Sequence, residues 1–104
     1  MTAASVDSVL LADVKNHVDI TWEDDATDKK IRELISQGMV YINGKYGMMA
    51  SYTSPGLPRT LLMEYVRYAR DSALDVFENN YMSMILAMQH ERQVEAYVES
   101  AKST

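Results

Sequence analysis

The chain has 104 residues, no cysteine and a formal net charge of −5. This length fits one domain with a single core, and the lack of cysteine excludes a disulfide scaffold, a thiolate zinc site and a cysteine nucleophile. The acidic balance argues against binding to nucleic-acid phosphates or anionic lipid, and no apolar run approaches the roughly eighteen residues that span a bilayer, so we expect a cytoplasmic protein without a membrane segment.

The first predicted helix runs from about Ser8 to His17, where Asp7 or Ser8 can cap its start. The connector that follows carries Ile20 and Trp22, and we expect both side chains to pin the next helix to the core. The apolar positions of the first helix recur at helical spacing and are Val6, Leu10, Leu11, Val14 and Val18.

A second helix is predicted from about Asp24 to Asn43, with Gly44 ending it in a left-handed conformation. Carboxylates crowd its start, where the helix terminus carries partial positive charge. Gly38 lies inside the apolar stripe, where it costs about 1 kcal/mol relative to Ala unless a neighbouring backbone needs the space. We therefore expect another helix to approach closely at Gly38. The other residues of the stripe are Ile31, Leu34, Ile35 and Ile42.

Residues 45–57 read KYGMMASYTSPGL and predict a long loop, because glycine, proline and serine interrupt regular structure. The stretch is nevertheless rich in large apolar and aromatic side chains. It is either a mobile loop that orders against a partner or a simple exposed connection. The side chains that favour the first interpretation are Tyr46, Met48, Met49 and Tyr52.

The densest pattern predicts a long, buried central helix over 58–78, with Pro58 at its first position. Its apolar residues cover an arc of about 160° to 180°, so more than one neighbour must cover it. The opposite side is charged, and Met63 and Leu74 interrupt it. These two are either isolated exposed residues or a small contact for another chain. The buried arc comprises Leu61, Leu62, Tyr65, Val66, Ala69, Ala73, Val76 and Phe77.

The residues at 78–80 predict a break, and a last helix follows from about Tyr81. Between Tyr81 and Met88 its apolar residues point in almost every direction. One small domain has difficulty covering such a helix, so the excess indicates contact between subunits, with Met82 and Leu86 on one side. After Gln89 the apolar pattern thins to Val94, Tyr97 and Val98.

Together these elements predict an all-α fold: a small bundle of about four helices around the long helix at 58–78, with a long loop at 45–57. We expect a single domain over 1–104, with flexible ends at 1–7 and 99–104.

No pattern in the sequence predicts a catalytic, cofactor-binding or metal site. His17 and His90 lie on different predicted helices, outside any H-E-x-x-H motif. Asp13 and His17 are four apart, a spacing typical of a surface ion pair. The acidic residues at 23–28 lack the spacing of an EF-hand and serve better as helix caps. We therefore expect a protein that is not an enzyme and has no cofactor.

Two blocks share their order and helical periodicity with one protein family. The first is LPRTLLMEYVRY at 57–68, continued by DSALDVFENNY at 71–81, and the second is WED at 22–24, followed by TDKKI at 27–31 and LI at 34–35. They span about residues 9 to 90 and carry no catalytic signature. In the order and periodicity of these blocks, the chain resembles the head-to-tail connector proteins of long-tailed bacteriophages and prophages, which are also called head-completion adaptors.

The resemblance implies an all-helical adaptor that forms a homo-oligomeric, twelvefold ring beneath the portal of a DNA-filled capsid. The ring would bind the portal protein on one side and the stopper or tail-completion protein on the other, and DNA would pass through without specific binding. Twelve copies at −5 each carry about −60, which would give a repulsive lumen. The location implied is the head–tail interface of the virion, after assembly in the host cytoplasm.

No family motif assigns contact residues, so the expected surfaces come from the residues alone. The alternative function is a small acidic helical regulatory protein that binds one cytosolic partner as a monomer or dimer. For the connector, the expected subunit interface comprises Met63, Arg67, Arg70, Leu74, Met82 and Leu86. The expected portal or stopper contacts are Tyr46, Met48, Met49, Tyr52, Val94, Tyr97 and Val98.

Overall fold

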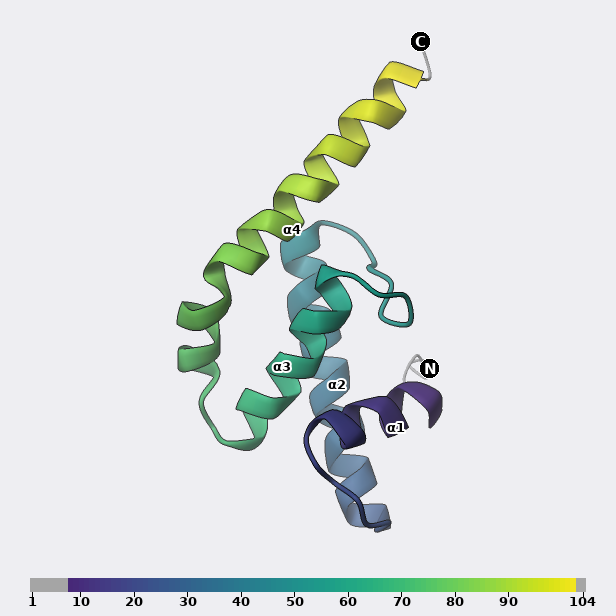
Figure 1. The fold of residues 1–104 in the computed structure, drawn as a ribbon, viewed down its shortest axis with the longest axis vertical. Coiled ribbons are helices and arrows are strands. Elements are labelled where there is room, and N and C mark those ends of the chain that lie inside the picture. Colours follow the sequence, from purple (N-terminus) through teal and green to yellow (C-terminus); the bar gives the residue numbers. More distant parts are fainter. Residues whose placement is uncertain (1–7, 103–104) are drawn as a thin grey trace.

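The computed structural model describes residues 8–102, which form four α-helices: α1 (Ser8–His17), α2 (Asp25–Tyr46), α3 (Leu57–Arg70) and α4 (Leu74–Lys102). No strand occurs within 8–102, so the predicted all-α class is confirmed. Figure 1 shows α2 and α3 side by side, α1 across the lower part of α2, and α4 rising along the bundle and beyond it. Val6 and the predicted flexible segment 1–7 lie outside the described residues.

The start of α2 is fixed by its cap. The Asp24 side chain accepts hydrogen bonds from the Thr27 backbone N–H at 2.9 Å and from the Thr27 hydroxyl at 2.8 Å. These bonds satisfy a donor that the helix itself leaves unpaired. In the preceding connector Ile20 is buried, as expected, but Trp22 is 51% exposed, so its predicted core position is wrong. The Ile20 N–H bonds to the Lys15 carbonyl, and this turn directs Ile20 inward and leaves Trp22 at the surface.

The end of α2 lies at Tyr46, and Gly47, not Gly44, has the left-handed conformation, with φ of 91°. The Gly47 N–H closes the last turn on the Asn43 carbonyl at 2.9 Å. Contacts with α4 explain the longer helix, because the Tyr46 hydroxyl donates to Glu95 Oε1 and the Lys45 carbonyl accepts from Gln89 Nε2. The loop between α2 and α3 therefore covers 47–56.

The predicted continuous helix at 58–78 is wrong, because the chain turns between Arg70 and Leu74. Ser72 lies in the left-handed region with φ of 54°, and the Ala73 N–H bonds to the Tyr68 carbonyl at 2.9 Å. The turn folds α4 back on α3, which buries the Phe77 ring against Tyr65 and Tyr68. A continuous helix would carry Phe77 away from these rings.

The remainder of α4 also departs from the sequence prediction. The helix passes without interruption through 78–80, where a break is predicted, and it continues to Lys102. Residues 99–102 of the predicted flexible tail are therefore helical, and 103–104 lie outside the described range. The last turns of α4 project beyond the other helices (Figure 1), and the described chain measures 53 × 30 × 21 Å.

The α2–α3 crossing confirms the expected close approach at Gly38. A Cβ atom built on Gly38 would lie 2.7 Å from Leu62 Cδ1 and 2.9 Å from Tyr65 Cδ1. Both distances are shorter than carbon atoms tolerate without a shift, and both partner side chains are buried in the core. Gly44, further along α2, has nothing within 4 Å of its own Cβ position.

We expect Gly38→Ala to lower the free energy of unfolding by about 1–3 kcal/mol, because overpacking at the crossing outweighs the better helix propensity of Ala. The matched control is Gly44→Ala, where only propensity changes and stability rises by about 0.5–1 kcal/mol. Urea unfolding followed by circular dichroism measures both. A Gly38→Ala variant as stable as Gly44→Ala would show that the α2–α3 crossing can accommodate a methyl group at position 38.

Candidate assembly surfaces

Glu64 is the one charged side chain buried in the core of residues 8–102. Its Oε2 atom accepts from His17 Nε2 of α1 at 2.5 Å, and its Oε1 atom accepts from the Tyr81 hydroxyl of α4 at 2.8 Å and from Arg67 Nη1 at 3.3 Å. The carboxylate thus cross-links α1, α3 and α4. Because His17 bonds to Glu64, it does not form the expected pair with Asp13. Asp13 instead pairs with Arg59 at 3.0 Å.

The electrostatics of the Glu64 cluster keep this carboxyl ionised. Burial works to raise the pKa of Glu64, but hydrogen bonds from His17 and Tyr81 and electrostatic interactions with His17 and Arg67 outweigh it, so the pKa lies below its ordinary value. The same bond to Glu64, together with burial, raises the pKa of Tyr81 to about 12. A carboxylate saturated by donors from its own chain acts as a structural link between helices.

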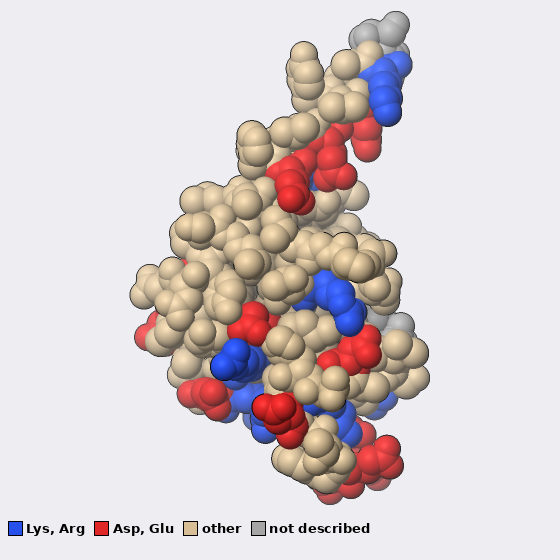
Figure 2. Space-filling model, in the orientation of Figure 1, with Lys and Arg blue, Asp and Glu red and all other residues tan. Residues whose placement is uncertain are grey.

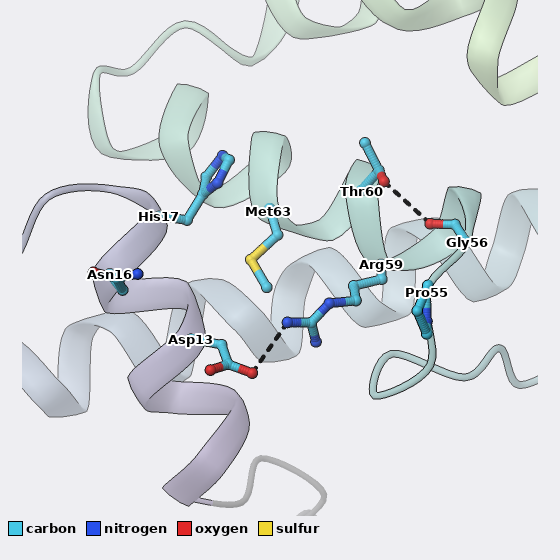
Figure 3. Close-up of a pocket in the computed structure, with 8 residues that line it drawn as sticks. All are labelled: Asp13, Asn16, His17, Pro55, Gly56, Arg59, Thr60 and Met63. Carbon is cyan, nitrogen blue, oxygen red and sulfur yellow. Dashed lines mark hydrogen bonds and ion pairs between the residues drawn. The ribbon is translucent and has the colours of Figure 1, made fainter.

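The hollow between α1, α3 and the loop has a volume of about 420 Å³ (Figure 3). Arg59 lies in it, donating to Asp13 Oδ2 at 3.0 Å and to the Tyr52 carbonyl at 2.9 Å. Met63 points into the same space and is only 7% exposed. Its expected place on an open subunit interface is therefore wrong, because α1 covers this face of α3.

The other expected interface residues fall into two groups. Arg67 and Arg70 are exposed but bond within the chain, Arg67 to Glu64 and Arg70 to the Val18 carbonyl at 3.1 Å. Arg70 therefore helps to hold the end of α1 on α3, whereas the Arg67 bond lies within α3. Leu74, Met82 and Leu86 are exposed on α4, as a contact surface requires.

The loop at 47–56 is tied to α2 through Asn43 and through the Met39 carbonyl, which accepts from the Tyr52 hydroxyl at 3.3 Å. Asn43 Oδ1 accepts from the Ala50 N–H at 2.9 Å and from the Tyr52 hydroxyl at 2.7 Å. Tyr52 is buried, and this burial raises its pKa to about 12. Tyr52 therefore does not face outward, and its expected position on a portal or stopper contact surface is wrong for this structure. Met48 and Met49 remain exposed at the loop surface.

The apolar surface of α4 is the largest set of uncovered hydrophobic side chains on one element of the described chain. Met82 and Leu86 lie one helical turn apart, and Leu86 is 57% exposed. Further along α4, Val94, Tyr97 and Val98 are also exposed. Val94 lines a hollow with the loop and the start of α3, and the last turns of the helix project beyond the bundle (Figure 1). Half-buried Tyr46 is bonded to Glu95 beside this part. Figure 2 shows acidic side chains gathered on the same projecting segment.

The comparisons with known proteins add no relative: no family model, no curated protein and no solved structure matches the chain. Within the described residues, no helix is long and apolar enough to cross a membrane. The same residues contain no group of three or more His, Asp or Glu side chains arranged to hold a metal ion.

The Glu64 cluster is the feature that sequence reasoning missed. Periodicity places Glu64 on the charged side of α3, where a carboxylate needs no explanation. The signal that could have found it is Met63, since an apolar residue beside it on that side indicates that another helix covers the surface. The donors come from residues 17 and 81, whose proximity depends on the tertiary fold.

We expect Glu64→Gln to lower the free energy of unfolding at pH 7 by about 1–3 kcal/mol, because a neutral amide replaces an acceptor of charge-assisted bonds. The folded pKa of Glu64 is lowered, so its contribution is complete above the unfolded pKa of about 4.3 and is lost as the pH falls through the folded pKa. The difference between wild type and variant should therefore shrink toward pH 3. Urea unfolding of wild type and variant at pH 7 and pH 3 measures this difference in the free energy of unfolding.

Glu33→Gln serves as the control for this prediction, because Glu33 is exposed on α2 and its substitution should change stability by less than about 0.5 kcal/mol. A Glu64→Gln defect of the same size at pH 7 and pH 3 would show that the charge of Glu64 contributes nothing to stability.

We expect Asn43→Ala to expose the loop to chymotrypsin without unfolding the bundle. The change removes the acceptor of two loop hydrogen bonds, worth about 1 kcal/mol each, so loop opening should rise on the order of 5- to 30-fold. Cleavage sites identified by mass spectrometry should lie within 47–56. Gln37→Ala, exposed on the same helix, is the control and should leave the cleavage rate unchanged. Equal rates for the two variants would contradict the anchoring role of Asn43.

Proposed function

We propose that this protein is a structural component of a phage or prophage virion, a ring adaptor between the portal and the stopper or tail-completion protein that allows DNA to pass. The observation that carries the proposal is the apolar surface of α4, where Met82 and Leu86 stand exposed one turn apart. Together with the other exposed apolar residues of α4, they form a surface that another chain could cover. The resemblance of the sequence blocks at 22–35 and 57–81 supports the same conclusion.

In the proposed ring, the exposed apolar surface of α4 contacts a different surface of the neighbouring copy. Head-to-tail contacts of this kind form a ring when the rotation from one copy to the next, repeated, returns to the first copy. The proposed adaptor has no catalytic role, and its net charge of −5 per chain favours a lumen that DNA passes without binding.

Electron microscopy and native mass spectrometry of the protein with its cognate portal protein test the proposal. The expected result is a closed ring or a cap bound to the portal. A strict monomer or dimer that ignores the portal would contradict it and would favour a small acidic regulator instead.

The double substitution Met82→Asp and Leu86→Asp should weaken ring assembly by about 2–4 kcal/mol, on the order of 30- to 1,000-fold in affinity, because two buried contacts are replaced by charges. Its monomer should lose less than about 1 kcal/mol, since both side chains are already exposed. Native mass spectrometry on the portal measures assembly, and urea unfolding measures the monomer.

Ile85→Asp provides the contrast, because Ile85 is buried between the two tested positions and its change should cost more than about 3 kcal/mol of monomer stability. A double variant that assembles like the wild type would remove Met82 and Leu86 from the interface. A double variant as unstable as Ile85→Asp would place them in the core.

A further inference from the structure

We propose that two copies of this chain exchange their last helices, so that α4 of each copy packs against α2 and α3 of the other. The hinge of the exchange is the turn between Arg70 and Leu74. The exchanged dimer is a second assembly of the chain, beside the proposed ring, and it does not depend on that ring.

The turn at 71–73 lacks the residues that usually end one helix and begin the next. Ser72 takes the left-handed conformation, with φ of 54°, where a side chain is disfavoured and glycine is usual. Ala73 precedes the first residue of α4, and its methyl group cannot accept a hydrogen bond from the helix N–H groups, as a capping side chain does. A short hinge under strain favours the exchange of an element between copies.

A straight helix through the hinge keeps the backbone hydrogen bonds of the turn in number. In the turn, the N–H groups of residues 71–73 bond to the carbonyls of Tyr68 and Ala69 at 2.9 to 3.1 Å. In a continuous helix the same N–H groups bond to the carbonyls four residues earlier. Arg67 and Asp71 would then lie one helical turn apart with opposite charges, a spacing that supports a helix. The hinge residues are therefore as well suited to a helix as to the turn.

The surface that α4 covers is matched to α4 by specific contacts. Glu64 accepts from the Tyr81 hydroxyl at 2.8 Å, and the Phe77 ring lies 5.7 Å from the Tyr65 ring. An opened chain alone would expose Phe77 to water and would leave buried Glu64 without one of its donors, and both changes are costly. The α4 helix of a second copy restores the same contacts, so the partner is another copy of this chain.

Reciprocal exchange gives a closed pair of chains. In the single chain, α3 descends to the turn and α4 rises beside it, so the two helices are antiparallel (Figure 1). In the dimer, residues 57–102 of each chain form one helix of about 69 Å, and two such helices lie antiparallel. Each α4 then covers the α3 helix of the other chain, and a two-fold axis passes between the hinges. The exposed side of α4 at Met82 and Leu86 takes no part in the exchange.

A distance within one chain tests the inference, because an exchanged chain is straight and a closed chain is folded back. Spin labels are attached at Thr60→Cys on α3 and His90→Cys on α4, in a chain that has no other cysteine. The start of α3 and His90 line one hollow of the closed chain, so the labels are close together there. A straight helix separates residues 60 and 90 by about 45 Å. The labelled chain is mixed with an excess of unlabelled chain, unfolded in urea and refolded at low and high concentration.

The dimer separated by size-exclusion chromatography should give a label distance of about 45 Å by pulsed electron spin resonance, and the monomer should give the short distance. Ser72→Gly should lower the dimer association constant on the order of 100-fold, because glycine accepts the turn and disfavours the helix at both hinges of the dimer. Ser72→Ala is the matched variant. It retains the Cβ atom and is the better helix former, so it should raise the association constant roughly fivefold.

A dimer whose labels keep the short distance would overturn the inference, because closed chains would then associate through their outer surfaces. The absence of a dimer of Ser72→Ala at high concentration would also overturn it, as would equal association constants for the glycine and alanine variants. Electron microscopy with the portal protein tests the ring separately. A ring built from chains that never exchange would leave the proposed ring function standing, whereas exchange by chains that ignore the portal would support the inference and contradict the ring.

Discussion

The close approach of α2 and α3 at Gly38 is the constraint on which the other contacts of the bundle depend. Only a residue without a side chain lets Leu62 and the Tyr65 ring enter the groove of α2 at this point. The position of Tyr65 then sets the aromatic cluster, because its ring lies 5.6 Å from Tyr41 and 5.7 Å from Phe77. Such ring pairs contribute about 0.5–1.5 kcal/mol beyond their buried area. The depth of one helix crossing thus decides where the start of α4 packs.

Glu64 complements this apolar constraint with a polar one. It lies next to Tyr65 in sequence, so the crossing that inserts the Tyr65 ring also fixes where the carboxylate sits. A buried carboxylate is costly unless it is fully bonded, and its donors come from α1 and α4. Packing of α1 and α4 in another arrangement would leave this charge with Arg67 of its own helix as its remaining partner. Apolar contacts therefore bring the helices together, and Glu64 restricts them to one arrangement.

The helices could be predicted from sequence because their apolar periodicity is strong, and Gly38 could be assigned because it interrupts that pattern on its buried side. The errors share a physical cause. The turn at 71–73 contains neither glycine nor proline, yet Ser72 adopts a left-handed conformation, and the reversal packs Phe77 against Tyr65. Met63 is buried because α1 covers it. For the candidate surfaces, the sequence shows that α4 has more apolar residues than one small domain can cover. Which of these residues are buried and which are exposed depends on the helices that pack against α4, and this is not visible in the sequence.

In the proposed assembly, α4 connects the interior of one subunit to its neighbours. Its first turns are held by Phe77 in the aromatic cluster and by Tyr81 on Glu64, while its last turns project beyond the other helices. Because the helix is continuous, a small rotation at Tyr81 displaces the projecting end through a lever of about 30 Å. The angle between neighbours, and with it the number of copies that close a ring, is then set by contacts inside the monomer. The bond from Tyr81 to Glu64 therefore helps to set the direction in which the end of α4 leaves the bundle.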